Sequence, residues 1–195
     1  MLAATLILTG SAVAQQSIHQ VDFAHFVYPL SGPLLGHNGL VWLDPSRSRR
    51  EIRLVAGSDL NKISSFVMEG KEYSQYEGFK LDTVKFADLT GDGRDEAIVV
   101  LRYLSGGTQT SNYVYVYTLE DGHPKLLAYC HTGARAYSGL YAVYGSGGTL
   151  VFELFDPNHS WGNCCSSVVV VRRFRWQGDR FEPIGAPEHR AIAAP

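Results

Sequence analysis

Tyr113-Val-Tyr-Val-Tyr117 alternates an aromatic side chain with a β-branched one. Both residue types favour strands, and successive side chains of a strand point to opposite faces, so the tyrosines are expected on one face and the valines on the other. The run Glu120-Asp-Gly-His-Pro124 follows, and the apolar residues Leu126 to Tyr129 come after it. We therefore predict a β-hairpin with Asp121-Gly122 in its turn.

Short strand-like segments recur on both sides of this hairpin, and Gly- or Asp-containing turns separate them. A second hairpin is predicted where Val168 to Trp176 turns at Gly178 and returns through Arg180-Phe-Glu-Pro183. Because helix-period patterns are scarce, the sequence predicts an all-β fold, mainly antiparallel, built as a sandwich, a barrel or a partial propeller-like sheet. The other segments that we expect to form strands are Leu40–Leu43, Ile52–Val55, Ile63–Met68, Val84–Leu89, Ala97–Leu104, Leu140–Tyr144 and Leu150–Phe155.

The N-terminus carries an export signature. Residues Met1 to Ala14 contain no charged side chain and end in Ala12-Val13-Ala14, a small-x-small pattern typical of a secretory signal peptide. The alternative is a buried N-terminal strand or helix. The run is shorter than the ~20 apolar residues of a membrane helix, so no integral membrane segment is expected after cleavage. We predict a signal peptide at 1–14, a single β domain at 15–187, a flexible Ala- and Pro-rich tail at 188–195, and a secreted or periplasmic location.

The composition argues against two classes of partner. The 195 residues carry a net charge of −2, with an isoelectric point near 6.4. Nucleic acids and anionic membranes call for a basic excess, so neither is expected as a partner. The chain also lacks a G-x-S-x-G elbow, an H-E-x-x-H helix, a P-loop and a G-x-G-x-x-G turn before a helix.

Three cysteines, Cys130, Cys164 and Cys165, are present. Thiols pair in an oxidising compartment, and an odd number leaves one unpaired. We expect Cys130 to pair with Cys164 or Cys165, which would close a long loop and stabilise the fold by about 3–4 kcal/mol. A bridge between the neighbours Cys164 and Cys165 is the alternative.

The segment from Asp88 to Glu96 places oxygen-bearing residues at relative positions 1, 3, 5 and 9, with Gly93 at position 6. Ca²⁺ takes six to eight oxygen ligands from a flexible loop, and glycine permits the sharp turn. The spacing predicts a structural calcium site, and its expected ligands are the carboxylates of Asp88, Asp92 and Glu96, the Thr90 hydroxyl and the Arg94 carbonyl. A metal-free turn rich in Asp and Gly is the alternative.

This loop resembles the FG-GAP/VCBS-type repeat loops of exported bacterial proteins and integrin-like propellers. Their pattern, Asp-x-Asp/Asn-x-Asp-Gly-x-x-Asp before an apolar strand, is matched by Asp88, Asp92, Gly93 and the strand Ala97–Leu101. Thr90 stands where the family has Asp or Asn, and Glu96 stands where it has its last Asp. The resemblance implies a calcium loop in a small exported protein of unassigned activity. A single copy does not imply a full propeller.

A second candidate metal group combines His159, Cys164 and Cys165 with Cys130-His131, because thiolate and imidazole bind zinc or copper. The spacings are not those of known zinc motifs, and disulfide formation competes with metal binding.

We expect a non-enzymatic exported binding or structural protein that holds calcium in this loop. One alternative is a small secreted hydrolase whose carboxylates meet only in three dimensions, as glycosidase pairs do. Another is a module that binds carbohydrate or protein, with strand tyrosines as stacking platforms and the loops Ser105–Asn112 and Asp156–Asn163 as its rim. The carboxylates considered for the hydrolase are Glu69, Glu72, Glu77, Glu153 and Asp156, and the tyrosines are Tyr113, Tyr115, Tyr117, Tyr129, Tyr137, Tyr141 and Tyr144.

Overall fold

A computed structural model describes residues 17–35, 39–161 and 165–192. All pairings between its strands are antiparallel, and its helices are single 3₁₀ turns, so the prediction of an all-β, antiparallel fold is confirmed. None of the helices in these ranges is long and apolar enough to span a membrane. The elements are η1 (Ile18–Gln20), β1 (Val27–Leu30), β2 (Val41–Leu43), η2 (Pro45–Arg47), β3 (Arg50–Arg53), β4 (Ser58–Met68), β5 (Lys71–Ala87), β6 (Glu96–Ser105), β7 (Thr110–Glu120), β8 (His123–Thr132), η3 (Arg135–Tyr137), β9 (Leu140–Ser146), β10 (Thr149–Phe155), η4 (Pro157–His159), β11 (Ser160–Trp161), β12 (Cys165–Ser166), β13 (Val168–Trp176) and β14 (Phe181–Ala191).

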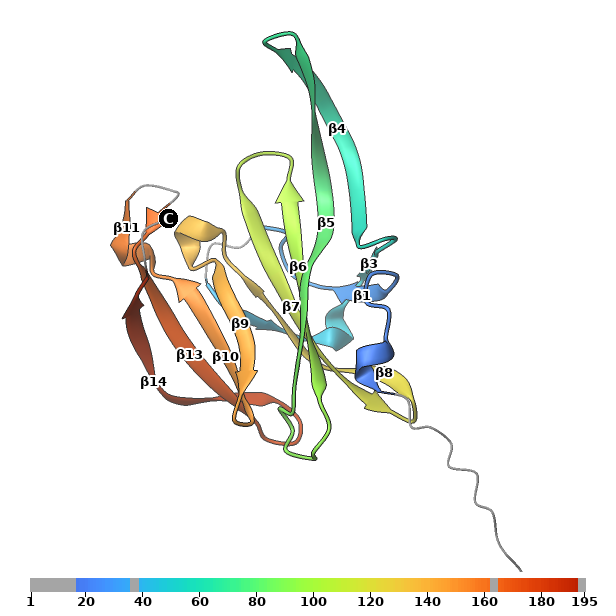
Figure 1. Ribbon diagram of the computed structural model, residues 1–195, viewed down its shortest axis with the longest axis vertical. Coiled ribbons are helices and arrows are strands. Elements are labelled where there is room, and N and C mark those ends of the chain that lie inside the picture. Colours follow the sequence, from blue (N-terminus) through green and yellow to red (C-terminus); the bar gives the residue numbers. More distant parts are fainter. Residues whose placement is uncertain (1–16, 36–38, 162–164, 193–195) are drawn as a thin grey trace, which may run out of the picture.

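The largest sheet has six strands in the order β2-β8-β7-β6-β5-β4 (Figure 1). Strands β4 to β8 follow one another in the chain and in the sheet, so each connection is a hairpin. The predicted hairpin between Tyr113 and Tyr129 is β7–β8, in which Val114 pairs with Cys130. Asp121 and Gly122 both have positive φ, which is the conformation of the turn that the sequence predicts.

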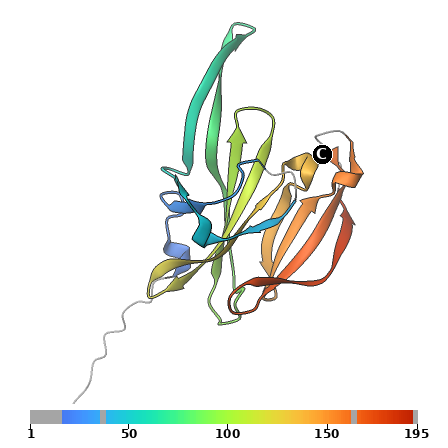
Figure 2. The ribbon, with the colours of Figure 1, turned by 180° about the vertical axis from the view of Figure 1, so that it is seen from behind.

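A second sheet of four strands, in the order β14-β13-β10-β9, packs against one face of the first (Figures 1 and 2). Strand β9 packs against β5, where a Cβ at Gly145 would lie only 2.2 Å from the Cβ of Ala87. Among the three predicted architectures, this packing is that of a sandwich. The buried side chains between the sheets are Leu89, Ile98, Val100, Val114, Val116, Cys130, Val143, Leu150, Phe152, Leu154, Phe174 and Phe181.

The opposite face of the six-stranded sheet is covered by the N-terminal segment and the small β1–β3 sheet. The tyrosines of β7 point to this side, where the Tyr113 hydroxyl donates to the Pro33 carbonyl at 2.6 Å and the Tyr115 hydroxyl donates to the Pro29 carbonyl at 2.9 Å. The buried apolar side chains of the covering segment are Ile18, Phe23, Tyr28, Leu30, Ile52 and Leu54. The central strands of the large sheet are therefore buried on both faces.

The β4–β5 hairpin projects beyond the rest of the molecule (Figure 1). The two strands pair from Ser58↔Lys80 to Met68↔Lys71, but β5 pairs with β6 only from Glu77 onward. Residues 61–76, here named the arm, are all exposed. The turn at the tip is formed by Glu69 and Gly70, both with positive φ.

The C-terminus differs from the prediction. Residues 188–191 are part of β14, in which His189 pairs with Val170 and Ala191 pairs with Val168. The predicted tail at 188–195 therefore starts too early, because the Pro- and Ala-rich composition does not prevent pairing at a sheet edge. Residues 193–195 and the predicted signal peptide at 1–14 lie outside the described residues.

His131 is a buried imidazole on β8. Its side chain is 2% exposed and lies beside the Tyr113 ring, with a centroid distance of 5.5 Å. Neither ring nitrogen has a hydrogen-bond partner among the described residues. Burial lowers the pKa of His131 below its usual value, since the site cannot solvate the charged form.

This burial predicts a pH-dependent stability. The unfolded chain protonates His131 below about pH 6.5, whereas the folded chain resists protonation, so unfolding takes up a proton and becomes easier as the pH falls below that value. His131→Leu is expected to raise the free energy of unfolding by about 1–3 kcal/mol, because it removes unpaired buried polar atoms. The substitution also removes the contribution of His131 to the pH dependence, which is a slope of up to about 1.4 kcal/mol of unfolding free energy per pH unit.

Urea unfolding at pH 7 and pH 5 measures both effects. The exposed His123 on the same strand provides the control variant His123→Leu, which should leave the pH dependence unchanged. Equal pH dependence in the wild-type chain and His131→Leu would contradict the interpretation.

Candidate functional site

The acidic loop connects β5 to β6. The Asp88 carboxylate lies over its own turn, where it accepts hydrogen bonds from the backbone N–H of Gly91 at 2.7 Å and of Gly93 at 3.0 Å. Both glycines have positive φ, near +80°, which is a conformation that glycine adopts without strain. The carboxylate thus stabilises the turn, as Asp side chains commonly do.

Glu96 points into the protein and is fully buried. One carboxylate oxygen accepts the backbone N–H groups of Leu89 at 2.8 Å and Thr90 at 3.0 Å, and the other accepts the Thr118 hydroxyl at 3.1 Å. Burial raises the pKa of Glu96, and these hydrogen bonds counter that rise only in part. Glu96 therefore joins the loop to the start of β6 and to β7.

Asp92 forms an ion pair with Arg94. The Arg94 guanidinium donates to the Asp92 carboxylate from Nε at 3.0 Å and from Nη2 at 2.5 Å, and the Arg94 backbone N–H donates to it at 2.9 Å. The guanidinium, followed by the backbone donor, holds the pKa of this carboxyl below its usual value. Asp88, Asp92 and Glu96 thus each have separate protein partners, and they do not form a group of three ligands within the described part of the chain. Calcium binding here stays a prediction.

Cys130 is a free thiol in the core between the two sheets. Burial raises the pKa of this thiol far above its usual value, which keeps it protonated and unreactive. The predicted pairing of Cys130 with Cys164 or Cys165 is therefore wrong, because the inward-facing position on β8 is filled by packing. Cys164 and the side chain of Cys165 lie outside the described residues, so the alternative bridge between them stays a prediction.

The strand tyrosines mostly belong to the core. Tyr113, Tyr115, Tyr117 and Tyr129 are buried under the N-terminal segment, and this position excludes them as surface stacking platforms. Among the other tyrosines considered, Tyr141 is 47% exposed. The alternation of Tyr and Val is thus explained by the burial of both faces of β7.

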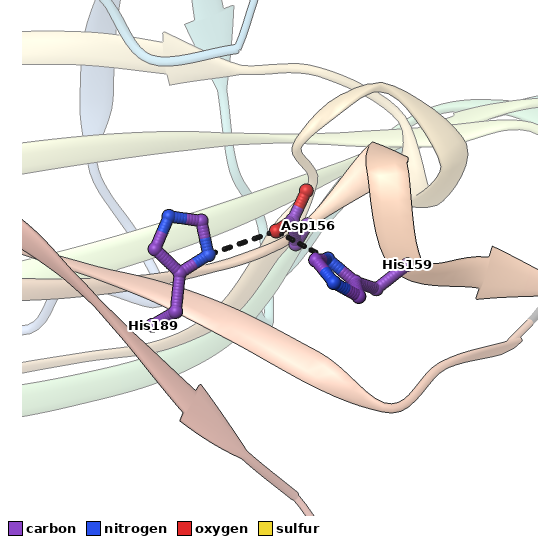
Figure 3. A group of neighbouring side chains, drawn as sticks. All are labelled: Asp156, His159 and His189. Atoms are coloured by element: carbon purple, nitrogen blue, oxygen red, sulfur yellow. Dashed lines mark hydrogen bonds and ion pairs between the residues drawn. The ribbon is translucent and has the colours of Figure 1, made fainter.

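A cluster of Asp156, His159 and His189 lies at one end of the four-stranded sheet (Figure 3). The Nδ1 of His159 lies 2.8 Å from the Asp156 Oδ2, and the Nδ1 of His189 lies 3.0 Å from the same oxygen. Asp156 follows β10, His159 ends the 3₁₀ turn η4, and His189 lies on β14. Three elements therefore direct one side chain each toward a common point.

Asp156 is held in place by its surroundings. Its side chain is 1% exposed, its Oδ1 accepts the backbone N–H of Asn158 at 2.9 Å, and its own N–H donates to the Val168 carbonyl at 3.0 Å. Burial alone would raise the pKa of Asp156, but the donors from Asn158, His159 and His189 outweigh it, so the pKa is lowered. The carboxylate is thus kept ionised beside two half-exposed imidazoles.

Ligand atoms of these three residues lie within 4.8 Å of one another, which makes the cluster a group able to hold a metal ion. In the described part of the chain, no other three His, Cys, Asp or Glu residues meet this condition. Two imidazoles and a carboxylate are ligands of zinc and related transition metals rather than of calcium.

Sequence reasoning found this cluster only in part. It considered His159 together with cysteines, and Asp156 as a hydrolase carboxylate, but it placed His189 in a tail. The Asp156-x-x-His159 spacing is a local signal that two ligands can meet across one turn. His189 gives no local signal, because only the pairing of β14 with β13, with His189 opposite Val170, brings it to the site.

The surface of the described residues also has depressions away from this cluster. One, of about 600 Å³, adjoins the acidic loop and is lined by Asp92, Arg94, Glu120, Asp121 and Trp176, among others. The other, of about 390 Å³, has an apolar floor that includes Trp42 and Phe181. Neither contains a group of three candidate metal ligands.

Comparison of the chain with models of protein families, with curated proteins and with solved structures finds no match.

The contacts of Glu96 predict a metal-independent role in stability. Glu96→Ala leaves the backbone N–H groups of Leu89 and Thr90 without their acceptor, so the free energy of unfolding should fall by at least about 2 kcal/mol. The neighbouring Asp95 is 40% exposed and pairs with His19 at the surface, so Asp95→Ala should cost less than about 1 kcal/mol.

Urea unfolding in the presence of a chelator measures this difference. Equal unfolding midpoints for the two variants, or a loss in Glu96→Ala that occurs only when Ca²⁺ is present, would contradict the assignment.

Proposed function

We propose that the chain is an exported, non-enzymatic binding protein that holds a partner protein on its projecting arm. The observation that supports this proposal is the exposure of large apolar side chains on residues 61–76. Phe66 is 46% exposed, Met68 53% and Tyr73 37%, although side chains of these types are usually buried. Export is the part of the proposal that follows from the signature at residues 1–14.

The pairing register places these side chains on one face of the arm. Phe66 lies opposite Tyr73, and their rings stack with a centroid distance of 5.6 Å. Met68 is two residues from Phe66 on the same strand and so shares its face. Phe66, Met68 and Tyr73 are here named the arm face. An exposed group of this kind is typical of an interaction site.

The arm is a two-stranded ribbon, a structure that is marginally stable in water without further packing. Its conformation would be stabilised by a partner that covers the arm face. Met68 adds a flexible side chain that adapts to the shape of a partner surface.

The charges of the arm favour a protein as that partner. Residues 61–76 contain Lys62, Lys71, Glu69 and Glu72, so two positive and two negative charges cancel. Nucleic acid and anionic membranes attract basic surfaces, and the arm is neutral. A register shift between Lys62 and Ser64 interrupts the outer edge of β4, which disfavours pairing of this edge with a second copy. We therefore favour a different folded protein that presents an apolar groove.

The arm proposal predicts a face-specific interaction. A photo-reactive amino acid at Gln75, on the arm face two residues from Tyr73, should cross-link the chain to one distinct protein of the exported fraction of its own cells. Phe66→Ser/Met68→Ser should reduce the adduct at least about tenfold, since it removes two apolar anchors.

Two controls separate this effect from non-specific capture. Val67→Ser, on the opposite face, should leave the adduct unchanged, and a photo-reactive residue at the exposed Arg175 of β13 should not form it. An adduct made only of two copies of the chain, an adduct unaffected by the double variant, or no adduct would each contradict the proposal.

A calcium ion in the loop from Asp88 to Glu96 is a separate proposal, supported by the spacing of its oxygens. Binding would require Asp88 to turn away from the N–H groups of Gly91 and Gly93, and Asp92 to release Arg94. Calorimetric titration with Ca²⁺ should give one site per chain and, at one hundred times the dissociation constant, about 2.7 kcal/mol of added stability. Asp88→Ala/Asp92→Ala should abolish both effects. Absence of heat and of stabilisation at millimolar Ca²⁺ would exclude the site.

A further inference from the structure

We propose that Asp156, His159 and His189 bind a divalent transition-metal ion, with Zn²⁺ as the best-fitting ion, at a surface site with an open coordination position. This proposal is independent of the arm and of the acidic loop, because it involves neither. It is based on the geometry of three side chains, one directly after β10, one on η4 and one on β14 (Figure 3).

The separations of the ligand atoms suit a small ion. The Asp156 Oδ2 lies 2.8 Å from the Nδ1 of His159 and 3.0 Å from the Nδ1 of His189. In a tetrahedral site with zinc bonds of about 2.0–2.1 Å, neighbouring ligand atoms are about 3.3 Å apart. The Asp156 Oδ2 therefore needs to move away from each of the two nitrogens by only a few tenths of an ångström for the ion to replace the two hydrogen bonds.

The carboxylate is oriented before any ion arrives. The backbone N–H of Asn158 holds the Asp156 Oδ1, which leaves the Oδ2 directed at the two rings. The side chain is almost fully buried, so it has little freedom to turn toward solvent. Outer hydrogen bonds of this kind are what orient ligands in metal sites.

The ligand set selects the metal. Imidazole nitrogen suits zinc, copper, nickel and iron, whereas Ca²⁺ and Mg²⁺ prefer oxygen. Three protein ligands with an open fourth position are typical of zinc sites that also hold water or an external ligand. The His159 and His189 side chains are 54% and 57% exposed, which leaves that position accessible from solvent.

Binding would strengthen the connection between β14 and the end of β10, which the Arg190–Glu153 ion pair and the His189–Asp156 hydrogen bond already join. Strand β14 lies at the edge of the four-stranded sheet, and its residues from Gly185 to Ala191 are exposed. An ion between His189 and Asp156 would join this half of β14 to the end of β10. Metal binding is therefore expected to raise the thermal stability of the chain.

The test is a calorimetric and thermal-melting titration of the whole chelator-treated chain with Zn²⁺, kept under reducing conditions. We expect one saturable Zn²⁺ site per chain and a rise in melting temperature. His159→Ala/His189→Ala should weaken binding at least about tenfold and remove the thermal shift. Both rings are exposed, so this double variant should fold, and its near-ultraviolet circular dichroism without metal should match that of the wild-type chain.

Two matched variants make the result specific. His19→Ala/His123→Ala removes two other exposed imidazoles and should leave Zn²⁺ binding unchanged. Cys164→Ser/Cys165→Ser removes the two thiols that follow His159 in the sequence and should also retain Zn²⁺ binding. Ca²⁺ in place of Zn²⁺ should give no signal that depends on His159 and His189.

Any one of three results would overturn the proposal. The first is no saturable Zn²⁺ binding at millimolar metal. The second is binding that persists unchanged in His159→Ala/His189→Ala. The third is binding that disappears in Cys164→Ser/Cys165→Ser, which would assign the metal to thiolates instead.

Discussion

Burial of both faces of β6 and β7 is the constraint on which the rest of the structure depends. The tyrosines of β7 pack under the N-terminal segment, while Val114 and Val116 pack against the four-stranded sheet. The hydroxyls of Tyr113 and Tyr115 donate to backbone carbonyls of the covering segment, so burial of these polar atoms carries no unmet hydrogen bond. Strand β7 thereby contacts both the N-terminal segment and the four-stranded sheet. The six-stranded sheet is the middle of three layers, and β7 packs against the two outer ones.

Because the central strands are buried on both faces, the candidate binding sites lie at the edges and ends of the sheets. The interior positions of the large sheet are filled by packing, and even the Cys130 thiol and the His131 imidazole serve as core side chains. The two candidate sites lie where strands end or leave the sheet. The arm extends past the point where β5 parts from β6, and the Asp156 cluster lies where β10 ends beside the edge strand β14. Both candidate sites are thus accessible because the strand pairing ends beside them.

The acidic loop shows how one sequence pattern serves two physical purposes. Asp and Gly at short spacing suit a calcium ion, and they equally suit a turn that accepts its own N–H groups. In this structure Asp88 holds the turn and Glu96 enters the core, where Leu89, Thr90 and Thr118 donate to it. Spacing alone does not distinguish these arrangements, since the direction of Glu96 is set by the layer into which β6 packs.

The local sequence pattern alone predicted the all-β class, the β7–β8 and β13–β14 hairpins and the turn at Asp121-Gly122. It could do so because side-chain alternation and turn preferences depend on residues that are close in the chain. It missed the polar first half of β5, which lies in the arm and pairs only with β4. It also ended β14 too early, because edge pairing needs little hydrophobicity. It considered Asp156 and His159 separately, in two different candidate sites, and did not predict that they meet each other and His189. That meeting depends on a strand register set by packing between distant segments, which only the tertiary structure decides.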